Sequence, residues 1–245
     1  MSSVEAAPEA PGVALPRCVA LTQEHRGHGA STAAYYLGRA LVAQGLRVLL
    51  ADLSQHQSPL MALVSHHPMR NLVPWTPAAI PPSQLSRLLA SARLSTAGRA
   101  DVILLDIDAT LLVRGDGLGG GVEYVAELVE SSPEGRGGAE RLAARLAGER
   151  GLEAARDRVG VVFTRVELPN VENLPNRLEN GVPVLGWLPA DYLLAAGEAY
   201  SVKGGTPATP HDAYLNAVKR LSQSLTRLVP LQRMGGVSQP HPRTA

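Results

Sequence analysis

Short apolar runs alternate with helical patterns along nearly the whole chain, and this alternation limits the fold more than any other feature. The runs RCVALT, LRVLLAD and ADVILLDID, at 17–22, 46–52 and 100–108, have the length and composition of buried strands. Amphipathic helical patterns occupy 83–94 and 211–229. Strands that alternate with helices form parallel sheets, because right-handed crossovers return the chain to the same sheet. The sequence therefore predicts a doubly wound α/β domain with a mostly parallel sheet and helices on both faces.

The remaining segments extend this pattern. Residues 158–166 and 182–189 predict two more strands, and 138–157 predicts one long surface helix. Four prolines within 70–82 indicate a loop or short hairpin there rather than a long element. By periodicity alone, 122–130 fits either a helix or a strand.

Composition narrows the class of protein. The chain has 245 residues, of which 45% are apolar and 18% are charged, as is typical of a folded globular domain. Its net charge of +1 gives no global attraction to nucleic acid or to an acidic membrane, so such binding would need a local patch. Cys18 is the only cysteine, which excludes an internal disulfide and fits a reducing cytoplasm. No apolar run reaches the ~18 residues of a membrane span, and no secretion signal is recognisable, so we expect a cytoplasmic protein without membrane attachment.

The chain is expected to form one domain over residues 15–230. Residues 1–14 are rich in Ala, Pro and Glu, and residues 231–245 are rich in Gly, Pro and polar side chains. Both segments predict disordered tails, because such compositions do not supply enough apolar surface for packing.

A glycine-rich turn, EHRGHGAST at 24–32, joins the first predicted strand to a predicted helix over STAAYYLGRALVAQG at 31–45. Backbone N–H groups of such a turn, together with the helix N-terminus behind it, form an anion cradle that needs no particular side chain. Residues 27–32 would form this cradle. The alternative is an ordinary tight turn in which Gly27 and Gly29 only supply backbone freedom.

The order of these segments resembles the ParA/MinD superfamily of deviant Walker A P-loop ATPases over roughly residues 16–229. The resemblance is carried by the glycine turn, by LRVLLADLSQ, ADVILLDID and RVGVVFTRV, by VPVLGWLPADYLLAAGEAYSVKGGTP, and by the last helix. It implies a P-loop NTPase-like fold, and it makes 122–130 a strand. It also implies ATP and Mg²⁺ as cofactors, and as partner a second copy, an intact relative in a heterodimer, or another protein.

The family's phosphate loop, KGGxGKT, matches residues 25–31. Two of its three glycines and its hydroxyl residue are present, but His25 and Ala30 stand where the family has lysine. The lysine inside the loop contacts the β- and γ-phosphates as a point charge, and alanine supplies neither charge nor hydrogen bond. Arg26 is the dependable cation nearby, because histidine is mostly neutral at about pH 7. The expected nucleotide contacts in this region are Gly27, His28, Gly29, Ala30, Ser31 and Thr32.

Further family motifs fall at strand ends. The DxD motif matches Asp52 and Ser54, so the acid that positions the attacking water is missing. The Walker B strand matches ILLDID, and its Asp106 would share a Mg²⁺ with Ser31, although Ile-Asp-Ala follows it instead of Thr-Pro-Pro. The alternative for Asp52 is an ordinary strand-end acid that caps the following turn. The resemblance places the adenine side at Thr164 and Arg165, with Pro189 and Asp191 near the base.

One leading hypothesis and two alternatives follow. Ala30 and Ser54 replace the lysine and aspartate of an efficient ATPase, so we expect a positioning or partitioning protein with a decayed nucleotide site, a pseudo-ATPase that acts as a scaffold through dimer or partner contacts. The first alternative is a slow Mg-ATP switch whose dimerisation is controlled by nucleotide. The second is a nucleotide-independent, non-specifically DNA-associated protein that uses Lys219, Arg220 and Arg227, although three cations on a helix are also typical of a solvated face.

Overall fold

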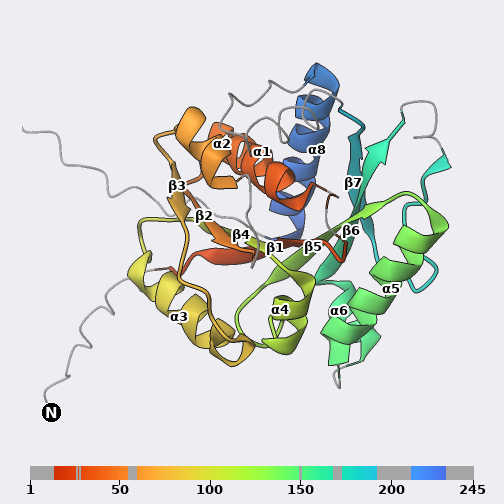
Figure 1. Ribbon diagram of the computed structural model, residues 1–245, viewed down its shortest axis with the longest axis horizontal. Coiled ribbons are helices and arrows are strands. Elements are labelled where there is room, and N and C mark those ends of the chain that lie inside the picture. The colour runs from red at the N-terminus through yellow and green to blue at the C-terminus, as the bar shows by residue number, and fades with distance from the viewer. Residues whose placement is uncertain are drawn as a thin grey trace, which may run out of the picture.

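The seven strands of the sheet all run parallel. The computed structural model (Figure 1) describes residues 14–25, 27, 29–54, 60–148, 151–167, 173–191 and 211–229. Within these residues the strand order is β3-β2-β4-β1-β5-β6-β7, and every neighbouring pair is parallel. The strands are β1 (Arg17–Thr22), β2 (Val48–Leu53), β3 (Leu72–Trp75), β4 (Val102–Ile107), β5 (Tyr124–Glu130), β6 (Val159–Val166) and β7 (Val184–Pro189).

Helices cover both faces of this sheet, which confirms the doubly wound α/β fold. Figure 1 shows α1, α2 and α8 on one face and α3, α4, α5 and α6 on the other. Buried Leu37, Leu104 and Leu221 belong to the core on the first face, and Leu89 and Phe163 to the core on the second. The described helices are α1 (Ala30–Ala43), α2 (Leu60–His66), α3 (Leu85–Ser95), α4 (Ala109–Arg114), α5 (Pro133–Ala147), α6 (Leu152–Arg156) and α8 (Asp212–Leu228).

The central strand, β1, lies between β4 and β5. After β1 the chain passes through α1 to β2 on one side, whereas β5, β6 and β7 extend the sheet on the other side. The register pairs Leu21 with Asp106 and Thr22 with Glu127 at the carboxyl end of β1. Ligands of open parallel sheets bind beyond the carboxyl ends at such a change of direction, so this end of β1 is the place to look for a site.

The expected strand at 122–130 is confirmed as β5, but the interpretation of 70–82 as a loop or hairpin is wrong in part. This segment contains β3, which pairs with β2 in parallel. Pro74 is compatible with a strand here because β3 is at the edge of the sheet, where one side of the backbone has no neighbour to which an N–H must be donated.

The single helix predicted over 138–157 is two helices. Helix α5 starts earlier, at Pro133, because the hydroxyl of Ser132 caps it by accepting a hydrogen bond from the Gly135 N–H at 3.1 Å. It ends before Gly148, whose φ of +51° cannot continue a helix, and α6 follows. The short helices α2 and α4 were not predicted from the sequence. Apart from Ala14, both expected tails lie outside the described residues.

None of the described helices combines the length and the apolar character that a membrane-spanning helix requires.

An ion pair between Arg47 and the buried Asp101 joins the residues directly before β2 and β4. The side chain of Asp101 is 3% exposed, and its carboxylate accepts hydrogen bonds from the Arg47 N–H at 2.7 Å and from the Arg47 guanidinium at 2.7 Å. The same guanidinium donates to the carbonyl of Gly98 at 2.5 Å. Because one buried carboxylate binds both the backbone and the side chain of Arg47, the pair ties the segments before β2 and β4 together at the amino edge of the sheet.

We expect Asp101→Asn to lower the free energy of unfolding by about 1–3 kcal/mol, because a hydrogen-bonded charge at a buried site is lost. Urea denaturation followed by circular dichroism measures this change. Glu153→Gln is the matched control: this carboxylate also faces an arginine, Arg156, but its side chain is 93% exposed, so little change is expected. Equal effects of the two substitutions would contradict the role assigned to the Arg47–Asp101 pair.

Candidate functional site

The turn between β1 and α1 has the backbone shape of an anion-binding loop. Gly27 and Gly29 adopt φ angles of +87° and +84°, which side chains with a Cβ rarely tolerate. Helix α1 begins directly after Gly29, whose carbonyl accepts a hydrogen bond from the Ala33 N–H at 2.8 Å. The first N–H groups of α1 therefore face the loop, as in helix-terminal phosphate sites. His28 and Arg26 lie outside the described residues.

The side chains of this loop supply little charge. Ala30 is 1% exposed, and its N–H donates to the amide oxygen of Gln23 at 3.2 Å. Ser31 is half-buried and Thr32 is buried. Lys219 lies on α8, outside this loop. The described part of the loop thus offers backbone donors and a hydroxyl, without a lysine of its own.

Two carboxylates lie side by side at the carboxyl edge of the sheet. Asp52 of β2 and Asp106 of β4 are register partners, and they are 8% and 3% exposed. Side chains alternate along a strand, so both acids lie on the face where Leu50 and Leu104 pack with α1. The N–H and the hydroxyl of Ser54 donate to Oδ1 of Asp52 at 3.1 and 2.7 Å. The residue that replaces the family's second acid therefore closes a turn onto the first.

A nucleotide-bound Mg²⁺ would be held by Ser31 and Asp106. The buried carboxylate of Asp106 lies beside the end of β1, and Ser31 belongs to the first turn of the helix that follows β1. Hydroxyl and carboxylate oxygens suit Mg²⁺, which takes most of its other ligands from water and phosphate. Among the described residues, no group of three or more His, Cys, Asp or Glu side chains is arranged to hold a metal by itself. The residues present fit an ion that arrives with a nucleotide.

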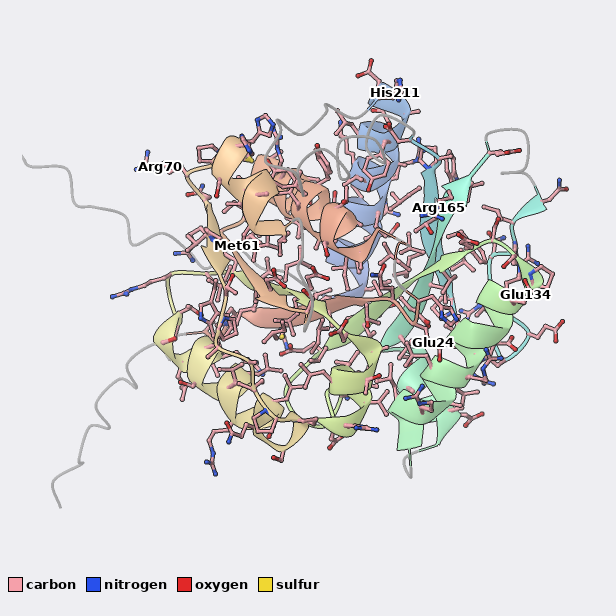
Figure 2. All side chains as sticks on the ribbon, viewed as in Figure 1. Glu24, Met61, Arg70, Glu134, Arg165 and His211 are labelled. Atoms are coloured by element: carbon pink, nitrogen blue, oxygen red, sulfur yellow. The ribbon has the colours of Figure 1, made fainter. Side chains whose placement is uncertain are left out.

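Arg165 connects the loop to the neighbouring strands (Figure 2). Its backbone has a φ of +55°, an unusual and costly conformation for a residue with a side chain. Its guanidinium donates to the carbonyl of Gly27 at 2.5 Å and to the carboxylate of Glu130 at 2.9 Å. Thr164, the preceding residue, is 4% exposed and donates to the carbonyl of Val129 at 3.2 Å. Arg165 therefore contacts the loop, whereas the hydroxyl of Thr164 is engaged within the sheet.

The remaining predicted residues lie farther from the loop. Pro189 is buried at the end of β7, an edge strand that β5 and β6 separate from β1. Asp191 accepts a hydrogen bond at 2.8 Å from the N–H of His211, at the start of α8 (Figure 2). On α8, Lys219, Arg220 and Arg227 are exposed, but the guanidinium of Arg220 stacks on the ring of Trp187 at 5.2 Å from its centroid.

A buried acid on the opposite face of the sheet was missed by the sequence analysis. Glu127 of β5 is fully buried, and within the described residues neither its carboxylate oxygens nor the hydroxyl of its register partner Thr22 has a hydrogen-bond partner. Burial, and secondarily the charge of Glu24, raises the pKa of Glu127 from 4.5 to about 8 against the opposing effect of Arg141 and Arg145. Glu127 is therefore mostly protonated at neutral pH.

This acid lies next to the segment that leads into the phosphate loop. Glu24 lies two residues after the end of β1, between the sheet and α5 (Figure 2), where Arg145 pairs with it at 3.4 Å. In the sequence, Glu127 alternates with Val125 and Val129, so the three side chains lie on the same face of a strand, the face that packs into the core. That signal becomes visible only once 122–130 is assigned as a central strand.

Comparison of the sequence with known protein families assigns the chain to one of them. The sequence matches the family described as CbiA, the CobQ/CobB/MinD/ParA nucleotide binding domain, over residues 19–201. Because this match spans most of the chain, the chain belongs to that family. None of the curated proteins matches the sequence.

Solved structures of the same family are similar in fold. The septum site-determining protein MinD complexed with Mg-ADP from Pyrococcus horikoshii OT3 has a TM-score of 0.64 and 16% identity, with 90% of this chain and 100% of that chain covered. MinD from Aquifex aeolicus has a TM-score of 0.61 and 18% identity, with 89% and 100% covered. A ParA family ATPase from Chlorobium tepidum TLS has a TM-score of 0.59 and 17% identity, with 85% and 99% covered. At these identities the likeness establishes the fold alone.

The buried Glu127 makes stability depend on pH. The unfolded chain releases this proton near pH 4.5 and the folded chain near pH 8, so its stabilising contribution is complete below 4.5 and is lost as the pH rises to 8. Each unit by which the pKa is raised corresponds to about 1.4 kcal/mol in the free energy of unfolding. Glu127→Gln, which cannot ionise, is expected to melt at an increasingly higher temperature than the unaltered protein as the pH rises from 5 to 8.

Thermal melts at several pH values measure this difference. Glu134→Gln, on the exposed first turn of α5, is the matched control and should show an offset that does not grow between pH 6 and pH 8. Parallel curves for Glu127→Gln and the unaltered protein would disprove the protonated state.

Arg165 should restrain the phosphate loop. Arg165→Ala removes the donor to Gly27, so the amide hydrogens of the described loop residues are expected to exchange faster by severalfold or more. Hydrogen exchange followed by mass spectrometry measures this change, with Arg177→Ala as control because, among the described residues, the Arg177 guanidinium donates only to a local carbonyl, that of Gly181. Unchanged exchange in the Arg165 variant would show that the loop holds its shape without this contact.

Proposed function

We propose that this chain is a ParA/MinD-like positioning or partitioning protein whose nucleotide site has decayed and which acts as a scaffold through dimer or partner contacts. One observation carries the proposal: the position of the loop lysine is held by a buried Ala30, and the position of the second acid is held by Ser54, whose hydroxyl bonds Asp52. Phosphoryl transfer depends on positioned positive charge and on an oriented water molecule. Neither is supplied at these two positions.

The similar structures support a role in contacts with other proteins. One of them is described as a MinC:MinD cell division protein complex from Aquifex aeolicus, with 16% identity and a TM-score of 0.60. A fold of this kind with a weakened site can still present the surfaces that a partner recognises, because the surfaces depend on the sheet and helices rather than on the loop lysine. A homodimer or a heterodimer with an intact relative is included in this proposal.

A cytoplasmic location is also part of the proposal. Cys18 is fully buried in β1, and burial raises the pKa of its thiol. The thiol therefore stays protonated and inert, as is usual for a structural cysteine in a reducing compartment.

A slow Mg-ATP switch is the second candidate, and the loop backbone favours it. The glycines keep the left-handed conformations of the cradle, and Asp52 and Asp106 lie together at the carboxyl edge. The similar MinD from Pyrococcus horikoshii is described as complexed with Mg-ADP. In this candidate Arg165 would supply a positive charge close to the loop.

Calorimetric titration with ATP and ADP in the presence of Mg²⁺ separates the two candidates. The unaltered chain is expected to bind weakly or not at all, and Ala30→Lys is expected to bind about ten- to a hundredfold more tightly, because a charged hydrogen bond contributes about 1.5–3 kcal/mol. Ala90→Lys, at an exposed position of α3, adds the same charge elsewhere and should change nothing.

Each outcome decides between the candidates. Micromolar binding and measurable hydrolysis by the unaltered chain would overturn the scaffold proposal in favour of the switch. No binding by either the unaltered chain or Ala30→Lys would exclude the switch and leave the scaffold, provided that circular dichroism shows both proteins to be folded.

A further inference from the structure

A groove lies between α1 and α8, away from the phosphate loop. It has a volume of about 660 Å³, and α1, α8 and the segment after α2 line it. Its apolar part is formed by Ala40 and Ala43 on α1 and by Leu215 and Val218 on α8. The volume and the mixed lining are those of small-molecule sites, which combine an apolar body with a few placed polar groups.

The charges of this groove have one sign. Arg39 and Lys219 are its permanently charged lining residues, and no carboxylate is among the lining side chains that the structure describes. His67 adds a third positive charge when it is protonated. The guanidinium of Arg39 contacts only uncharged groups in the described structure, the hydroxyl of Tyr35 at 3.4 Å and the Tyr35 ring. Its charge is therefore not neutralised by the protein there.

Hydrogen bonds and ring contacts hold the walls of the groove in place. The side-chain amide of Gln44, directly after α1, donates to the hydroxyl of Ser222 on α8 at 2.6 Å. The ring of Tyr36, which lines the groove, packs edge-on against Tyr214 at 5.8 Å. The hydroxyl of Tyr35 donates to the carbonyl of His67 at 3.2 Å and ties the segment after α2 to α1. A site with fixed walls needs little ordering when a ligand enters.

We infer that this groove binds a small amphipathic organic anion, with a carboxylate, sulfonate or phosphate group between Arg39 and Lys219 and an apolar body against Ala40, Ala43, Leu215 and Val218. Arginine and lysine together suit such a head group, because the guanidinium is a planar double donor and the ammonium a compact charge. DNA is a poorer fit, because a duplex requires several cations along an open face rather than two around an apolar hollow. This inference does not depend on the nucleotide site.

The fluorescent probe anilinonaphthalene sulfonate tests the inference, because it combines an anionic group with an apolar body and brightens in an apolar site. The full chain should bind the probe saturably at one site. The double variant Arg39→Gln, Lys219→Gln is expected to bind about tenfold or more weakly, and Ala43→Phe, which fills the groove without changing its charge, should also lose binding. Arg227→Gln, an exposed cation of α8 outside the groove, is the matched control and should bind as the unaltered chain does.

Competition identifies the ligand body. Displacement of the probe by decanoate would indicate an acyl chain, and displacement by adenosine monophosphate would indicate an aromatic base; either supports a groove site when the two groove variants abolish it. Probe binding that is unchanged in both variants would overturn the inference, because the probe would then be bound elsewhere. Retention of duplex DNA that the double variant abolishes, without saturable probe binding, would overturn it in favour of a DNA surface.

Discussion

The hydrogen-bond ladders that hold β1 between β4 and β5 are the constraint on which the rest of this structure depends. They place the end of β1 beside Asp106 on one side and Glu127 on the other, so the loop that follows β1 emerges between two strands of fixed register. The side chains of β1 from Cys18 to Thr22 are buried, so this strand cannot shift without exposing the core. The position at which the loop starts is therefore fixed by the central strands of the sheet.

The two faces of the sheet differ in their electrostatics at this point. On the α1 face, Asp52 and Asp106 stand next to each other at the carboxyl ends of β2 and β4. On the α5 face, Glu127 is held in an apolar setting that favours its neutral form. Arg165 of β6 contacts both the Gly27 carbonyl in the loop and the carboxylate of Glu130 at the end of β5. The loop thus lies between a face of the sheet that carries two aspartates and a face on which burial favours a neutral glutamic acid.

The fold could be read from the sequence because its strands are short apolar runs separated by helical patterns, a signal that depends only on local periodicity. Where this signal is weak, the prediction was wrong. The segment with Pro74 was predicted as a loop or hairpin but contains an edge strand, and the predicted long helix is two helices that end and begin near Gly148 and Gly151. At the candidate site, positions at strand ends could be assigned from the order of motifs. The contact from Arg165 to Gly27 could not, because it joins residues 138 positions apart through a side chain whose direction only the folded chain defines.

The groove between α1 and α8 and the buried Glu127 illustrate the same limit. Arg39 and Lys219 belong to helices at opposite ends of the chain, and nothing in the local pattern of either helix indicates that they share a hollow. Glu127 differs from a surface acid only through its three-dimensional neighbours. Properties that arise from long-range packing need the structure, whereas properties that arise from periodicity do not.

The hydrogen bond from the Ala30 N–H to the side chain of Gln23 affects which backbone donors the start of α1 can offer to a ligand. This amide oxygen satisfies one of the donors that the start of α1 would otherwise present to solvent or to an anion. In the switch candidate, a phosphate at this loop would compete with that neutral amide oxygen for the Ala30 N–H, and a charged acceptor would be favoured in that exchange. The first turn of α1 thus has one of its backbone donors satisfied by a side chain of the same loop.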